Sequence, residues 1–152
     1  MSLFEKISED IKTTMLAREK EKLEALRAIK AAFLVAKTEK GAPPELTADM
    51  ELKIIQKLVK QRKESAEIYI AQGRKDLHDN EMFEASVIEQ YLPKQLDADE
   101  LKKILKAIIE KVGAKTPSDM GKVMGVASKE LAGKADGKLI AETVKNLLGG
   151  NK

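Results

Sequence analysis

Apolar residues recur every three or four positions along most of this chain, and this spacing restricts the fold more than any other feature. Such spacing places apolar side chains on one face of an α-helix. No stretch alternates convincingly between apolar and polar residues, as a half-buried β-strand does. The sequence therefore predicts an all-α protein built from amphipathic helices.

Breaker and capping residues divide the first part of the chain into four expected helices. The first two cover residues 3–17 and about 23–37, and the turn signal Gly-Ala-Pro-Pro follows at 41–44. Thr47 is expected to cap a third helix that runs to about residue 71. A fourth helix is expected over residues 76–91. The side chains predicted to face inward from these helices are Phe4, Ile7, Ile11, Met15, Leu23, Leu26, Phe33, Leu34, Ile55, Leu58, Val59, Phe83, Val87 and Ile88.

Three shorter helices are expected in the rest of the chain, and their ends are clearly marked. Asp97 and Glu100 are expected to form a capping box at the start of the first of them, which Gly113 ends. Residues 116–119, Thr-Pro-Ser-Asp, begin the second in the order of cap, proline and acid that helix starts prefer. The end of the second helix and the start of the third are marked by Gly133 and Asp136.

Pro93 separates the longer helices from the shorter ones. The residue before a proline disfavours the helical conformation, so the fourth helix is expected to stop here. We therefore place the boundary at residues 92–96. The expected domains are a four-helix N-terminal part at residues 1–92 and a compact three-helix domain at residues 97–152.

Positive charge is concentrated in the second of these parts. Residues 1–93 contain 16 Lys and Arg against 17 Asp and Glu, whereas residues 94–152 contain 12 Lys against 8 Asp and Glu. A mild positive field favours an anionic partner such as RNA. If charge were the only evidence, an ordinary solvated surface would be the preferred explanation, so charge alone does not identify a partner.

Several classes of protein are not expected from this composition. The chain has no cysteine, which excludes disulfides, thiolate metal sites and a cysteine nucleophile. The single histidine, His78, lies in an acidic helix start and is expected to be solvated rather than bound to metal. The longest apolar run, at residues 31–36, is too short to span a membrane. We expect a cytoplasmic protein with no cofactor, no metal, no membrane association and no catalytic machinery of its own.

Arg62 is the first residue whose position suggests a specific role, since it falls within the apolar face of the third helix. A guanidinium group that faces inward needs a carboxylate or carbonyl partner. One interpretation is a structural ion pair with a glutamate of a neighbouring helix, for which the candidates are Glu24, Glu84 and Glu89. The other is a contact with a phosphate or a partner protein at a groove between the two lobes.

Two glycines lie inside the sixth expected helix, where each costs about 1 kcal/mol relative to alanine. Gly121, Gly125 and Ser128 form a seam of small residues on this helix. One interpretation is tight packing against a neighbouring helix. The other is the close approach of an RNA sugar-phosphate backbone, with lysines beside it at Lys122, Lys134 and Lys138.

Six short motifs, in this order, resemble those of the GatB/YqeY family, specifically its stand-alone YqeY-like members. The resemblance covers nearly the whole chain. The motifs are Ala25-Leu26-Arg27, Lys60-Gln61-Arg62-Lys63-Glu64-Ser65, Gly73-Arg74-Lys75-Asp76-Leu77, Tyr91-Leu92-Pro93-Lys94-Gln95-Leu96, Met120-Gly121-Lys122-Val123-Met124-Gly125 and Gly133-Lys134-Ala135-Asp136-Gly137-Lys138.

The resemblance implies a helical N-terminal part, a small three-helix domain, and a relation to the tail of the B subunit of the tRNA-dependent amidotransferase. Members of the family carry the label of carbon–nitrogen ligases that use glutamine as amide donor, but the resemblance supplies no catalytic residue. Possible partners are tRNA and the amidotransferase or aminoacyl-tRNA machinery. The alternative is a helical protein–protein adaptor without RNA binding. The expected RNA-binding residues are Lys122, Lys134, Lys138, Gly121 and Gly125, and the expected structural or groove residues are Arg27 and Arg62.

Overall fold

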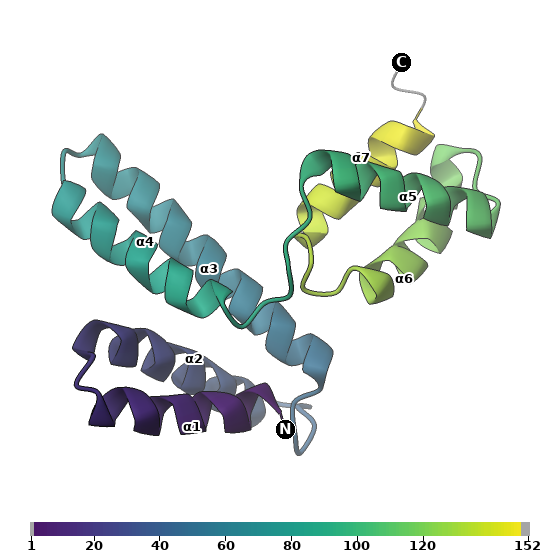
Figure 1. The fold of residues 1–152 in the computed structure, drawn as a ribbon. Coiled ribbons are helices and arrows are strands. Elements are labelled where there is room, and N and C mark those ends of the chain that lie inside the picture. The colour runs from purple at the N-terminus through teal and green to yellow at the C-terminus, as the bar shows by residue number, and fades with distance from the viewer. Residues whose placement is uncertain (1, 150–152) are drawn as a thin grey trace. The chain divides into compact units, whose positions relative to one another are not determined.

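The computed structural model describes residues 2–149, and it confirms that the protein is all-α (Figure 1). The described residues form seven α-helices and one short 3₁₀ helix, η1, with no β-strand among them. No helix in this part of the chain is long and apolar enough to cross a membrane. The elements are α1 Leu3–Leu16, α2 Lys20–Thr38, α3 Ala48–Ala71, α4 Lys75–Glu89, α5 Ala98–Val112, η1 Pro117–Asp119, α6 Met120–Glu130 and α7 Gly137–Leu148.

The chain divides into two compact units, Met1–Leu92 and Pro93–Lys152. In the first unit, α1 packs on α2 and α3 packs on α4, and each pair runs as a helical hairpin (Figure 1). Contacts of α2 with α3 and α4 join the two hairpins. The apolar faces of the four helices meet in a core that contains Ile7, Ala25, Leu26, Ile29, Phe33, Ile55, Val59, Ala85, Val87 and Ile88.

Three side chains that the apolar pattern places in this core are exposed instead, so the prediction is wrong for Met15, Leu34 and Phe83. Leu34 follows Phe33 directly, and consecutive helix residues point about 100° apart. Because Phe33 fills the core, Leu34 faces solvent. On α4 the buried face is centred on residues 85–88, and Phe83 lies to one side of it.

A buried carboxylate joins α1 to α3 in the first unit. The Glu51 side chain is only 4% exposed, and its Oε2 accepts a hydrogen bond of 3.0 Å from the Phe4 backbone N–H. This N–H belongs to the first turn of α1, where backbone donors lack helical partners and a negative charge is favourable. Packing alone thus does not hold the start of α1 in place.

We expect Glu51→Ala to lower the free energy of unfolding by about 1.5–3 kcal/mol, because it removes a charged acceptor from a part-buried N–H. Urea unfolding followed by circular dichroism measures this loss. Glu51→Gln keeps an acceptor and is expected to lose less. Equal losses for the two variants would show that the hydrogen bond does not account for the effect.

In the second unit, α5, α6 and α7 pack against one another around a core of their own. The start of α5 is confirmed as a capping box of Asp97 and Glu100, and its end as Gly113 with φ of 71°. The start of α6 differs from the prediction, since the residues after Thr116 form η1 before the α-helix begins at residue 120. The buried core residues are Leu101, Leu105, Ile108, Ala114, Val123, Ala127, Leu131, Ala135, Ile140, Val144 and Leu148.

Candidate nucleic-acid interface

Local hydrogen bonds set the position of α6. The Asp119 carboxylate accepts bonds from the backbone N–H groups of Lys115 and Thr116, at 2.9 and 3.2 Å, and one from the Thr116 hydroxyl at 3.3 Å. These bonds hold the pKa of Asp119 below its usual value, and the charge of Lys122 adds to the effect. The ionised Asp119 therefore anchors the turn that leads into α6 at neutral pH.

The glycine seam on α6 faces open space. Gly121, Gly125 and Ser128 are all exposed. A Cβ atom added at either glycine would meet no atom of the structure within 4 Å. The interpretation that these glycines allow close packing against a neighbouring helix is therefore wrong for the described chain, where the buried side of α6 consists of Val123 and Ala127.

The three predicted lysines are all exposed, one near the start of α6 and two beyond its end. Lys122 lies in the first turn of α6, whereas Lys134 and Lys138 belong to its connection with α7 and the first turn of α7. With 11 residues, α6 is about 16 Å long. A ligand that contacts all three lysines must therefore be elongated.

Lys129 is an exposed lysine that the predicted site lacked. It follows Lys122 by seven residues, which is close to two helical turns, so the two side chains lie on the same side of α6. The seven-residue spacing of Lys122 and Lys129 can be read from the sequence, so the sequence carried the signal for this residue. Lys129 adds a positive charge between the two places that the other lysines occupy.

The connection between α6 and α7 brings two of the quoted motifs together. The Gln95 side-chain amide donates to the backbone carbonyl of Gly133 at 2.6 Å, and the Leu96 N–H donates to the carbonyl of Lys134 at 3.0 Å. Gly133 has φ of 75°, a conformation that favours glycine. The segment before α5 thereby fixes the backbone that carries Lys134.

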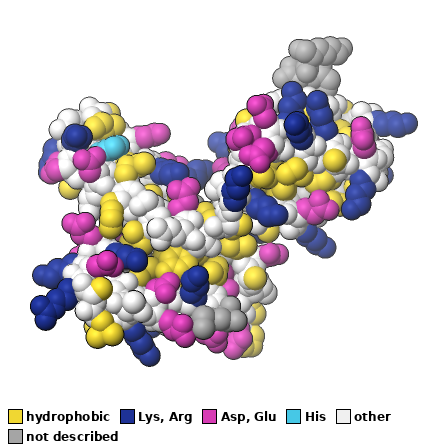
Figure 2. All heavy atoms as spheres, viewed as in Figure 1, with side chains coloured by type: hydrophobic (Ala, Val, Ile, Leu, Met, Phe, Trp, Pro, Cys, Tyr) yellow, Lys and Arg dark blue, Asp and Glu magenta, His cyan; other side chains and the backbone are white. Residues whose placement is uncertain are grey.

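The surface of the second unit is mixed in charge despite its net positive balance. Figure 2 shows Lys side chains around this unit on the face drawn, with acidic side chains between them. One basic side chain, that of Lys111, is within 3.7 Å of Glu130. The field of the unit is therefore moderate, and specific positions matter more than total charge.

The two predicted arginines lie in the first unit, apart from the lysines in the sequence and in separate environments. Arg27 is exposed on α2, and Arg62 is half-buried on α3. Neither residue is in the unit that carries the glycine seam. The first unit thus carries a second candidate site around Arg62.

The expected structural ion pair of Arg62 is not found among the described residues. No carboxylate in residues 2–149 forms an ion pair with it, and Glu89, one of the proposed partners, pairs with Lys63 at 3.5 Å instead. Burial raises the pKa of Glu84, and the nearby charge of Arg62 acts in the opposite direction. Arg62 lines a groove within the first unit, and all of the residues that line it come from α3 and α4.

The histidine and the acidic side chains of the described chain do not gather into a metal site. His78 is half-buried, and its Nδ1 is 3.0 Å from Asp79 Oδ1. No group of three His, Asp or Glu side chains within residues 2–149 is placed to hold a metal ion.

Comparison with known families gives one assignment. The family model described as Yqey-like protein matches residues 4–148, which is nearly the entire chain and includes both units. No curated protein matches the chain. The match covers all six motifs quoted above, including the glycines and lysines of α6 and its connection to α7. On this match, the chain belongs to the family of YqeY-like proteins.

Proposed function

We propose that this protein is a non-catalytic, cytoplasmic tRNA-binding module whose second unit holds the RNA sugar-phosphate backbone along α6. The observation that carries the proposal is the open glycine seam, where Gly121 and Gly125 face no atom of the protein within 4 Å. Two glycines inside a helix cost stability, about 1 kcal/mol each, and internal packing does not account for them. An external ligand that approaches the helix closely gives them a purpose.

The charges beside the seam suit a phosphate chain. Exposed lysines lie at the start of α6, on its later turns, and at the connection to α7: Lys122, Lys129, Lys134 and Lys138. A polyphosphate backbone is elongated and can contact positive charges spread over about 16 Å, the length of α6. The moderate charge of the unit fits a contact that depends on position rather than on a strong field.

Recognition by base stacking is not part of the proposal. All five aromatic residues precede residue 93, so residues 94–152 contain none. A surface without aromatic side chains offers no platform for single-stranded bases. Binding is therefore expected to depend on the shape and phosphates of a folded RNA.

The identity of the RNA rests on the family. The resemblance to the tail of the amidotransferase B subunit points to tRNA, and the six motifs, at residues 25–138, all lie within the matched range. The label of glutamine-dependent carbon–nitrogen ligase is not proposed for this chain alone, since no nucleophile constellation or phosphate-binding loop is present in its sequence. The proposed partners are tRNA and the proteins that charge or amidate it.

Fluorescence anisotropy of labelled tRNA, titrated with the full chain at several salt concentrations, tests the proposal. We expect binding at low salt that weakens steadily as salt rises, because phosphate contacts release counterions. A pull-down with amidotransferase subunits and tRNA identifies the associated machinery. Absence of tRNA binding at about 50 mM salt, where such contacts are strong, would reject the proposal.

Exposed apolar side chains in the first unit favour the adaptor as the second candidate function. Leu16 is 86% exposed and Val35 is 62% exposed, and both lie on the α1–α2 hairpin. Other large apolar side chains exposed in this unit are Met15, Leu34, Ile68, Ile70, Met82 and Phe83. Capture of a partner protein through these residues, together with no binding of tRNA, would favour the adaptor.

Replacing Gly121 and Gly125 together by alanine is expected to stabilise the protein and weaken tRNA binding. The added methyl groups meet no atom, so helix propensity alone raises the stability of the second unit by about 2 kcal/mol in total. Thermal unfolding measures the gain, and anisotropy measures the affinity. A stabilised variant with unchanged affinity would show that RNA does not contact the seam.

We also propose that the two units fold as separate domains, a four-helix domain at residues 1–92 and a three-helix domain at residues 97–152. Each unit has its own buried core, and no residue belongs to both. Separate cores allow separate unfolding transitions. Calorimetry of a variant that destabilises only the second core tests this organisation.

A further inference from the structure

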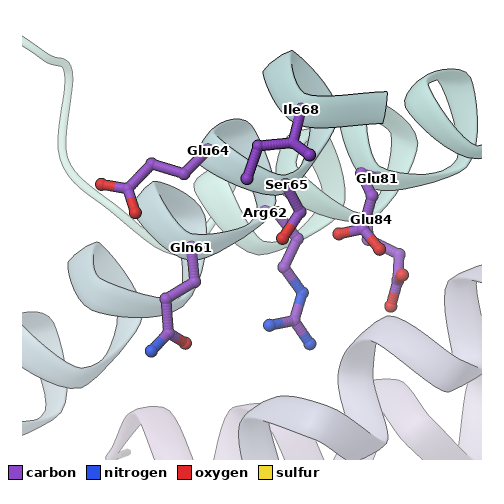
Figure 3. A pocket seen from close by; sticks show the side chains of 7 residues that line it. All are labelled: Gln61, Arg62, Glu64, Ser65, Ile68, Glu81 and Glu84. Carbon is purple, nitrogen blue, oxygen red and sulfur yellow. The ribbon is translucent and has the colours of Figure 1, made fainter. Parts of the chain in front are cut away.

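A groove of about 540 Å³ lies in the first unit, and none of its lining residues is proposed to bind RNA (Figure 3). Five of its lining residues come from α3 and two from α4. It includes much of the second quoted motif, which the proposed function does not use. The lining residues are Gln61, Arg62, Glu64, Ser65, Ile68, Glu81 and Glu84.

Arg62 places a positive charge in this groove without a paired carboxylate. The side chain is half-buried, and no acidic group among the described residues forms an ion pair with it. Its guanidinium carries five N–H donors in a planar arrangement that suits a carboxylate. Figure 3 shows the guanidinium projecting from α3 into the open space of the groove. An anionic group of a ligand is the partner that this position lacks.

Glu84 places a negative charge in the same groove, where other carboxylates lie near it. Burial raises its pKa, the charge of Arg62 lowers it, and the charges of Glu81 and Glu24 raise it further. The side chain thus lies among two other carboxylates and one guanidinium. Figure 3 shows Glu81 and Glu84 extending from α4 on the side of the groove opposite Gln61. A cationic group of a ligand would relieve the repulsion among these carboxylates.

The two charges lie on one groove, yet they do not form an ion pair with each other. A molecule that carries both charges itself can contact the two side chains, because both line the groove. The volume lies within the range of small-ligand sites, about 300–1,000 Å³. Ile68, whose side chain is more than half exposed, supplies an apolar surface in the lining.

We propose that this groove binds a small zwitterion of the α-amino acid class. The ligand's carboxylate lies on the Arg62 guanidinium, its ammonium group lies between the Glu84 and Glu81 carboxylates, and its apolar side chain lies against Ile68. Each charge of the ligand then meets an opposite charge, from Arg62 or from Glu84 and Glu81, that forms no ion pair among the described residues. The site is independent of the proposed RNA interface.

Isothermal titration of the full chain with leucine tests the site, with Arg62→Gln and Glu84→Gln as the variants. Leucine is expected to bind the unaltered chain, and each variant is expected to bind about tenfold more weakly, since each loses one charged hydrogen-bond partner. The matched controls are Lys57→Gln and Glu67→Gln, which remove the same charges from exposed positions on α3 outside the groove. Both controls are expected to bind leucine as the unaltered chain does.

Two further probes separate a zwitterion site from a site for one charge. If the groove binds only anions, inorganic phosphate binds, Arg62→Gln abolishes its binding and Glu84→Gln strengthens it. If the groove binds only cations, spermidine binds, Glu84→Gln weakens its binding and Arg62→Gln strengthens it. Either pattern without leucine binding overturns the proposal, as does the absence of binding by all three probes. Loss of leucine binding in both variants, with both controls intact, supports it.

Discussion

Replacing Lys122, Lys134 and Lys138 together by alanine is expected to cause the largest loss of tRNA affinity that any exposed substitution produces. Each lysine that neutralises a phosphate contributes roughly tenfold in affinity at about 0.1 M salt through counterion release. Three such contacts therefore account for a loss of up to about a thousandfold. The plot of log affinity against log salt should become less steep by about three units. Anisotropy titrations at several salt concentrations measure both quantities.

The control for this variant removes the same charge from the first unit. Lys12, Lys53 and Lys57 are exposed there, and their replacement by alanine is expected to change the affinity only slightly. An equal loss in the two variants would show that net charge, rather than the α6 surface, governs binding. An unchanged slope of log affinity against log salt in the variant at Lys122, Lys134 and Lys138 would exclude these lysines as phosphate contacts.

Leu105→Ala is expected to have the largest effect on stability. Leu105 is fully buried in the core of the second unit, and truncation of such a leucine costs about 2–5 kcal/mol. A unit of about 60 residues is stabilised by only a few kcal/mol. We therefore expect the second unit of the variant to be largely unfolded at 37 °C and tRNA binding to be lost. Calorimetry and anisotropy measure the two consequences.

The same variant tests whether the units unfold separately. The first unit has its own core, so its thermal transition is expected to stay in place while that of the second unit moves to lower temperature. Leu139→Ala, at a partly exposed position of α7, serves as the control and should shift neither transition much. A single transition that moves as a whole would contradict separate domains.

The ends of most helices could be predicted because local chemistry determines them. The Thr47 cap, the capping box of Asp97 and Glu100, and the Gly113 end all appear in the structure as expected. Each depends on bonds or backbone angles within a few residues, so the information lies in neighbouring positions of the chain. The prediction was less accurate for the fourth helix, which ends at residue 89 and not near residue 91.

The environment of Arg62 and the glycine seam could not be predicted in this way. Periodicity places Arg62 on an inward face, but the distance to Glu84 and Glu89 depends on how α3 and α4 pack. The same limit applies to Gly121, because an internal glycine in a helix indicates close approach without identifying what approaches. Only the packed structure shows that a Cβ added there would meet no atom of another element among residues 2–149.

The sequence by itself determined that this protein is all-α, where its helices are capped, and which motifs it shares with the YqeY-like family. Local hydrogen bonds, side-chain periodicity and residue order carry those properties, and none of them requires distant contacts. The tertiary structure decided that the glycines of α6 face open space and that Arg62 lines a groove without an ion-pair partner. These properties depend on which helix faces lie against one another, and packing sets that relation among residues far apart in the chain.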